Sequence, residues 1–350
     1  MSEPHASPVL AGKHLDIEQP GALVAYLRRT GRIGAREQPA VRVLSGGVSN
    51  RVVLLERPSG ESWVLKQALA KLRVRVDWYS SPERIHHEAL GLRWLERLAP
   101  QGTITPLVFE DHEHHLLAMH AVPEPHDNWK TLLLAGHLSR DHVTQAAQLL
   151  GEIHRRAWER RGELLPIFED RSYFESLRLE PYYGYAAEQA PAAAAFIESL
   201  IAETRDCRLT LVHGDYSPKN VLVHEGRLVL LDHEVIHWGD PAFDIGFFLT
   251  HLLSKAHHLP AHREAFADAA GLFWRVYLEA AGRVEWAAEL EPRAARHTLG
   301  CLLARVAGRS QLEYLSEAER TRQREGVLAL MLGAAPVRVS ELIHTFVERL

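Results

Sequence analysis

The sequence is poor in cysteine and contains no long apolar run. Its two cysteines, Cys207 and Cys301, lie far apart in no metal-binding spacing, so we expect neither a disulfide framework nor a cysteine-ligated metal. This pattern predicts a reduced, cytoplasmic protein. No apolar run reaches the roughly 18 residues that a transmembrane helix needs. The first residues also lack the charged start and apolar stretch of a secretory signal, so we expect no association with a membrane.

Basic residues are not in excess either. The chain has 40 Lys and Arg against 45 Asp and Glu, which gives a formal net charge of −5. Together with the absence of a basic stripe, this argues against a nucleic-acid-binding protein. A chain of 350 residues with 46% hydrophobic and 24% charged residues is an ordinary globular sequence, long enough for two lobes. We expect a small-molecule partner, and leave a homodimer open as the assembly.

Histidine, in contrast, is abundant. Several of the 22 histidines form clusters, at 86–87, 112–115 and 257–258. A zinc site on a helix would combine two ligands one turn apart with further ligands, and none of these clusters shows that context in the sequence. We therefore expect solvated surface histidines.

The stretch 211–246 organises the rest of the chain. Short apolar runs cross this region at 209–212, 221–223 and 228–231. The sequence His-Glu-Gly at 224–226 predicts a tight hairpin between the last two runs. Asp215 and Asn220 precede this hairpin and Asp232 follows it, so we expect their side chains at one end of a small sheet. Carboxylate and amide oxygens suit Mg²⁺, and this spacing is that of kinase catalytic machinery.

Each polar residue of this region has a functional interpretation and a simpler alternative. Asp215 is predicted to accept the proton of a substrate hydroxyl, or else only to form a turn after glycine. Asn220, Asp232 and Glu234 are predicted metal ligands. The simpler alternative is a loop cap for Asn220 and a solvated strand end for Asp232 and Glu234. Alternation in an extended segment would place Asp232 and Glu234 on one face, where two carboxylates need a cation between them. Asp244 is predicted to hold the catalytic loop rigid, to cap the following helix, or both.

The N-terminal part predicts an antiparallel sheet with two helices. We expect strands at 41–44, 52–56, 62–67, 105–109 and 116–119, and helices at 19–30 and 82–98. Gly46 and Gly47 form the first turn, where backbone N–H groups would bind nucleotide phosphates, although a plain hairpin turn is the alternative. Lys66 ends the third strand and is predicted to contact the same phosphates. That role needs a carboxylate from the second helix, for which Glu88 is predicted and Glu83 is the alternative.

A polar segment with two prolines, 121–127, is the predicted connector between the lobes. The backbone of Met119, His120 and Ala121 would face an adenine there. Beyond it the chain turns helical, with helices expected at 141–161, 186–203, 245–253, 263–281, 293–315, 318–332 and 339–350. The predicted fold class is α+β, with a small β-rich N-lobe at 1–120 and a larger, mainly helical C-lobe at 121–350.

These motifs resemble those of the aminoglycoside phosphotransferase and choline kinase-like superfamily, whose kinases carry His-Gly-Asp, here His213-Gly214-Asp215. The chain is more closely similar to the 5-methylthioribose kinase family. The motifs that carry this similarity are Lys66-Gln67-Ala68-Leu69, Val74-Arg75 with Trp78, Asp232-His233-Glu234, Phe243-Asp244-Ile245-Gly246 and the glycine-loop Asn50.

The resemblance implies a bilobal protein-kinase-like fold, ATP and Mg²⁺ as cofactors, and phosphoryl transfer to a hydroxyl of a small sugar-like metabolite. It places Asn50 at the ATP site and gives His213 a structural role, and Arg305 and Trp238 are the predicted substrate-binding residues. The chain also departs from the family. Ala304-Arg305 replaces two adjacent arginines, Asn220 stands where the family tends to have serine, and His233 replaces proline.

These departures leave the catalytic residues intact and alter the acceptor pocket. An aminoglycoside, choline or homoserine-type phosphotransferase of the same superfamily is therefore an alternative. A non-catalytic nucleotide-binding pseudokinase is the alternative from another class, although the predicted base, lysine and metal ligands are all present.

Overall fold

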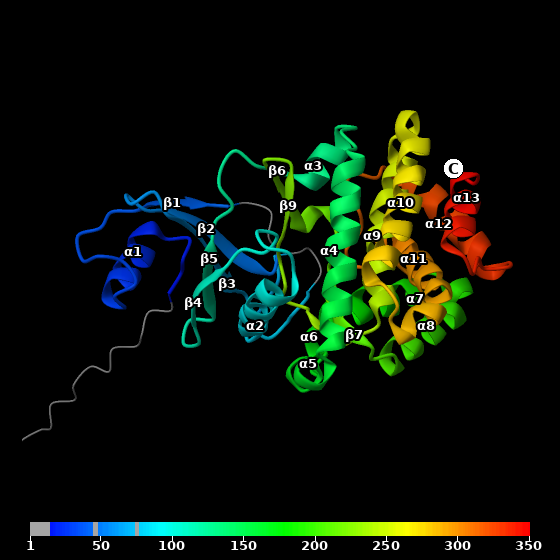
Figure 1. Ribbon diagram of the computed structural model, residues 1–350. Coiled ribbons are helices and arrows are strands. Elements are labelled where there is room, and N and C mark those ends of the chain that lie inside the picture. The colour runs from blue at the N-terminus through cyan, green and yellow to red at the C-terminus, as the bar shows by residue number, and fades with distance from the viewer. Residues whose placement is uncertain (1–14, 45–47, 74–76) are drawn as a thin grey trace, which may run out of the picture.

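The computed structural model describes residues 15–44, 48–73 and 77–350 (Figure 1). The predicted phosphate-binding residues Gly46 and Gly47, and the Val74-Arg75 motif, lie outside the described residues. The N-terminal elements are α1 (Pro20–Arg29), β1 (Ala40–Val43), β2 (Asn50–Glu56), β3 (Ser62–Ala68), α2 (Arg84–Leu98), β4 (Leu107–Asp111) and β5 (Leu116–His120). They match the predicted sheet and helices in order and type.

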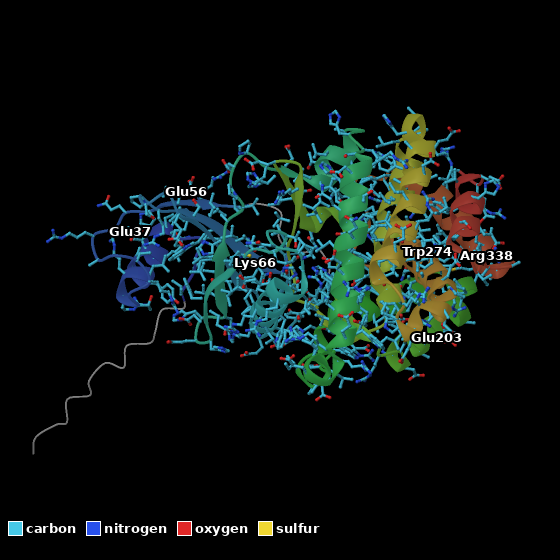
Figure 2. The ribbon with its side chains drawn as sticks, viewed as in Figure 1. Glu37, Glu56, Lys66, Glu203, Trp274 and Arg338 are labelled. Atoms are coloured by element: carbon cyan, nitrogen blue, oxygen red, sulfur yellow. The ribbon has the colours of Figure 1, made fainter. Side chains whose placement is uncertain are left out.

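The five strands form an antiparallel sheet in the order β1-β2-β3-β5-β4. Successive side chains of a strand point to opposite faces, which gives each face its own partner. Leu65 of β3 packs with Leu23 and Leu27 of α1 in one apolar cluster. Its neighbour Lys66 points to the opposite face, and Figure 2 shows it on the side of the sheet towards the helical lobe.

The helical lobe follows a short connector and contains most of the remaining elements. Its first part comprises β6 (Asp127–Asn128), α3 (Trp129–Leu134), α4 (Arg140–Glu159), α5 (Arg161–Phe168), α6 (Ser172–Phe174), a π-helix (Glu175–Gly184), α7 (Tyr185–Gln189) and α8 (Ala194–Asp206). Its second part comprises β7 (Thr210–Val212), β8 (Val221–His224), β9 (Arg227–Leu230), β10 (His237–Gly239), α9 (Pro241–His258), α10 (Arg263–Ala281), α11 (Leu290–Ala307), α12 (Glu317–Leu332) and α13 (Val339–Val347). Helix α4 stands between the sheet and the later helices (Figure 1). The bilobal α+β architecture is confirmed, and the boundary at residue 120 stays a prediction.

The central hairpin forms as the sequence predicts. Strands β8 and β9 pair antiparallel, with Val221 opposite Leu230. The turn residues Glu225 and Gly226 both have positive φ, 49° and 75°, as the tight primed turns of hairpins require. The apolar run before the hairpin, at 209–212, contains β7. This strand pairs with β10 and not with the hairpin.

Three helix predictions need correction. The helix expected at 186–203 is split into α7 and α8, because Pro191 begins a separate 3₁₀ turn between them. The helix expected at 293–315 ends at Ala307, before Gly308, so residues 308–316 form a loop. The helix after Asp244 begins earlier than expected, and Asp240, not Asp244, is its N-cap, accepting a hydrogen bond from the amide of Ala242 at 3.0 Å. None of the helices in the described ranges is long and apolar enough to span a bilayer.

Candidate active site

The predicted ion pair between the sheet and helix α2 is present. Nζ of Lys66 lies 2.6 Å from Oε1 of Glu88, and 2.9 Å from Oδ1 of Asp232. The alternative partner Glu83 has a side chain that is 57% exposed, and its contacts are with histidines. Lys66 therefore joins strand β3, helix α2 and the segment after β9 at one point.

The charges of Lys66 and Asp232 stabilise each other, whereas burial outweighs Lys66 at Glu88 and raises the pKa of that carboxyl to about 7. Burial tends to lower the pKa of Lys66, but the carboxylates of Asp232 and Glu88 outweigh it and raise that pKa above its ordinary value. Burial tends to raise the pKa of Asp232, and the ammonium of Lys66 more than reverses this and lowers it. We therefore expect Lys66 to be cationic and Asp232 anionic at neutral pH.

Asp215 lies on the loop after β7, with two donors on one of its oxygens. Its Oδ2 accepts hydrogen bonds from Nδ2 of Asn220 at 2.6 Å and from the guanidinium of Arg178 at 2.8 Å. Arg178 also donates to the carbonyl of Gly214 at 3.0 Å, so it holds both the backbone and the side chain of this loop. The hydrogen bonds within the described chain leave Oδ1 of Asp215 free to accept a proton.

Asp244 positions the backbone of the same loop, as predicted. Its buried carboxylate accepts hydrogen bonds from the amides of His213 at 2.7 Å and Gly214 at 2.8 Å. His154 lies 3.3 Å from the same carboxylate, and the ring of His213 accepts from the amide of Asp215 at 3.2 Å. These contacts fit the structural roles predicted for His213 and Asp244.

Gly214 is required in this loop by its conformation and by its surroundings. Its φ is +77°, and a Cβ added there would lie 2.9 Å from Cγ2 and 3.0 Å from the carbonyl oxygen of Val235. We predict that Gly214→Ala lowers the free energy of unfolding by about 1–3 kcal/mol more than the positive φ alone would cost, because this crowding adds to it.

Gly226→Ala is the matched control. Gly226 has φ +75° with nothing within 4 Å of an added Cβ, so it carries the backbone strain without the clash. Denaturant unfolding of both variants measures the difference, and equal losses would contradict the role of crowding at Gly214.

Asp232 and Glu234 do not lie on one face of an extended segment, so that part of the prediction is wrong. Asp232 has φ +68°, and the chain turns at Glu234. Each carboxylate instead has its own cation, since Glu234 accepts from Nε of Arg84 at 3.1 Å, and also from Nδ2 of Asn50 at 3.2 Å. Local strain of this kind is typical of functional loops.

The side-chain oxygens of Asn220, Asp232 and Glu234 that accept no hydrogen bond form a donor set that suits Mg²⁺. Among the hydrogen bonds of the described residues, Asn220 uses its nitrogen, Asp232 uses Oδ1 and Glu234 uses Oε2. One oxygen of each side chain therefore remains without a protein partner. Hard oxygen ligands of this type are those that Mg²⁺ takes, together with phosphate oxygens.

Two cavities meet at this cluster. The strand cavity, of about 520 Å³, lies against the face of the sheet that carries Lys66. Its lining includes most of the predicted nucleotide-binding residues, namely Asn50, Lys66, Met119, His120 and Ala121. Glu88 does not line this cavity, but it forms an ion pair with Lys66, which does. The helix cavity, of about 870 Å³, is lined by Asp215, Glu234 and Arg305 among others. Asp232 and Lys219 line both cavities.

The structure places one predicted substrate residue elsewhere. Trp238 lies on β10, is 1% exposed, and donates to the carbonyl of Arg208 at 3.3 Å. It lines neither cavity, so its role is to pack β10 against β7. Arg305, the other predicted substrate residue, does line the helix cavity.

Sequence reasoning missed Arg84, Arg178 and Lys219. Arg178 lies in a ten-residue π-helix, a rare element that is frequent at functional sites, and its sequence resembles an ordinary helix. Arg84 is fully buried at the start of α2, where an arginine is expected to be solvated. Lys219 could have been found from the sequence, because it directly precedes the predicted metal ligand Asn220.

Comparison with known proteins identifies the family of the chain and related folds. A sequence model described as "Phosphotransferase enzyme family" matches residues 40–283. A methylthioribose kinase of Pectobacterium carotovorum subsp. carotovorum (strain PC1) is 27% identical over 282 residues, which are 70% of this chain and 68% of that protein. A macrolide 2'-phosphotransferase from Brachybacterium faecium, in its apoenzyme structure, superposes with a TM-score of 0.53 at 20% identity, covering 87% of this chain and 96% of that one. Choline kinase from Cryptosporidium parvum Iowa II superposes with a TM-score of 0.55 at 12% identity, covering 90% and 95%.

Proposed function

The chain belongs to the phosphotransferase enzyme family, and we propose that it transfers the γ-phosphoryl group of ATP to a hydroxyl of a small sugar-like metabolite. The observation that carries this proposal is the meeting of the two cavities at Asp232, with Lys66 in one and Asp215 in the other. A nucleotide in the strand cavity would present its phosphates to an acceptor in the helix cavity at that point.

The described residues divide the chemistry between them. The acceptor hydroxyl attacks the γ-phosphorus as the bond to ADP breaks, and its proton passes to Oδ1 of Asp215. Arg178 and Asn220 hold the carboxylate in place through Oδ2. Lys66 would bind nucleotide phosphates, and Asn220, Asp232 and Glu234 would hold Mg²⁺, which neutralises phosphate charge when bound. Most of the rate enhancement in such reactions comes from positioning and charge stabilisation.

Methylthioribose is the first acceptor to test, because curated relatives of this chain are methylthioribose kinases. The experiment measures ADP release with ATP and Mg²⁺ over a panel of methylthioribose, other pentoses, homoserine, choline and aminoglycosides. Turnover with one class assigns the acceptor. Nucleotide binding without turnover on any acceptor would favour the pseudokinase alternative.

An acceptor with an anionic group is a second candidate, favoured by Arg305, a cation that lines the helix cavity and has no ion-pair partner among the described residues. Arg305 donates to Tyr182 and Ser310, its Nε has no hydrogen-bond partner, and no carboxylate of the described chain forms an ion pair with it. Buried Lys255 lies behind the lining residue His251 and donates to its carbonyl at 3.2 Å. Burial lowers the pKa of Lys255 to about 7; repulsion from Lys130 and Arg305 adds to this shift, and attraction by Glu313 opposes it.

The part of the cavity that Arg305 lines lies within reach of the reacting group. The guanidinium carbons of Arg178 and Arg305 lie 5.6 Å and 5.4 Å from the centre of the Tyr182 ring. Since Arg178 forms an ion pair with Asp215, Arg178 and the Tyr182 ring together connect the predicted base to Arg305.

We predict that Arg305→Gln raises KM for an anionic acceptor by about 10- to 100-fold, because a hydrogen bond to a charged group contributes about 1.5–3 kcal/mol. KM for a neutral analogue should change little, and Arg305→Lys should recover part of the loss. Arg296→Gln, on the same helix and paired with Glu203 at 3.0 Å, is the control. An equal rise in KM for neutral and anionic acceptors would rule out anion recognition by Arg305.

A further inference from the structure

Lys219 lies where the strand cavity meets the helix cavity, and it lines both of them. It belongs to a short 3₁₀ turn, Pro218–Asn220. The carbonyl of Lys219 accepts a hydrogen bond from Nδ2 of Asn128 at 2.7 Å, and the amide of Asn220 donates to the carbonyl of Ser217 at 2.9 Å. The backbone of the turn is therefore fixed on both sides, although Lys219 itself is exposed.

Most of the lysines and arginines that line the two cavities form an ion pair with a carboxylate of the described chain. These paired cations are Arg42, Lys66, Lys130, Arg178 and Arg309. Lys219 and Arg305 form no such pair among the described residues, and Arg305 lines the helix cavity alone. Lys219 is therefore the cation whose charge no carboxylate of the described chain takes up at the meeting point of the cavities.

The charge of Lys219 acts on the predicted metal ligand Asp232. Burial tends to raise the pKa of this carboxyl, Lys66 lowers it most, and Lys219 adds to the lowering. The ammonium of Lys219 thus lies close enough to Asp232 to influence it, yet forms no ion pair with it in the described chain. An ammonium in this position is available to an anionic group that enters between the cavities.

We propose that Lys219 is a further catalytic residue, whose ammonium binds a peripheral oxygen of the phosphoryl group while that group is transferred; this rests on the proposed function. The acceptor oxygen bonds to the γ-phosphorus as the bond to the ADP oxygen breaks, and the hydroxyl proton passes to Asp215. Lys219 keeps its own protons throughout.

The position of Lys219 suits a group that moves. The phosphoryl group begins on a nucleotide in the strand cavity and ends on an acceptor in the helix cavity, and Lys219 lines both. In the loose transition state the negative charge is spread over the equatorial oxygens, where a nearby cation is most effective. An ammonium on a flexible stem with several rotatable donors can follow those oxygens as they move.

The test compares the steady-state kinetics of Lys219→Met and the wild type, with ATP, Mg²⁺ and the acceptor that turns over fastest. We expect kcat and kcat/KM for ATP to fall together by about 10²- to 10³-fold, the usual loss for one preorganised charge. Affinity for ADP alone should change little, whereas affinity for ADP with aluminium fluoride and acceptor, an analogue of the transition state, should fall as kcat does. Lys219→Arg should recover part of the loss, and Tm should not change, because the residue is exposed.

Lys71→Met is the matched control, since Lys71 is an exposed lysine that lines neither cavity. It should leave the kinetics unchanged. An unchanged kcat in Lys219→Met, with turnover by the wild type, would overturn the role of Lys219 and leave the proposed function standing. A higher KM for ATP at an unchanged kcat would also overturn it, because Lys219 would then bind the ground state as well as the transition state. Absence of wild-type turnover with every acceptor would overturn both proposals.

Discussion

Asp215→Asn is expected to lower kcat by about 10³-fold or more, because an amide cannot accept the proton of the attacking hydroxyl. The substitution keeps the size of the side chain, so the loop should remain bound to Asp244 through the amides of His213 and Gly214. Nucleotide affinity should therefore change little. Initial rates of ADP release with the best acceptor of the panel measure the effect, and fluorescence titration with a nucleotide analogue measures binding.

Asp141→Asn provides the matched control, since it makes the same change on an exposed residue in the first turn of α4. It should retain full activity. If Asp215→Asn also retained turnover, the assignment of Asp215 as base would have to be abandoned.

Lys66→Met is expected to lower kcat/KM for ATP by about 10²- to 10³-fold, the usual loss when one preorganised charge is removed from a reacting centre. It should also destabilise the protein. Glu88 is fully buried, and Lys66 is its ion-pair partner in the structure. Breaking a buried pair on one side costs about 3–5 kcal/mol, because it leaves a charge uncompensated.

A double variant separates the catalytic effect from the structural one. Lys66→Met with Glu88→Leu removes both charges and should recover much of the lost stability without recovering activity. Lys71→Met, at an exposed lysine paired with Asp77 at 2.7 Å, should affect neither property. Recovery of activity in the double variant would show that Lys66 acts only on folding.

The catalytic hairpin was predictable from the sequence because its determinants are local. Short apolar runs and the turn at Glu225-Gly226 specify β8 and β9, and the distance in sequence from Asp215 to Asn220 is short enough to bring them together. The Lys66–Glu88 pair was predictable for a similar reason, since an amphipathic helix after a strand has one face available to it. The family resemblance rests on these same residues, and the comparisons confirm it.

Other features depended on contacts between residues remote in the sequence. The partner of Glu234 is Arg84, 150 residues earlier, and the side chain of Asp215 is held by Arg178 from a π-helix that no sequence period indicates. Trp238 illustrates the opposite error, because an aromatic residue near catalytic motifs proved to be core packing. Burial depends on all the elements around a residue.

Local patterns of apolarity and turn residues were thus sufficient for the order of the strands and helices, the kinase-type motif and the predicted base. Which cation neutralises each carboxylate, and which buried arginine has no ion-pair partner among the described residues, were decided by tertiary packing. The physical reason is that backbone preference and hydrophobic periodicity act over a few residues. Charge compensation in a buried site acts through space, between residues that only the completed fold brings into contact.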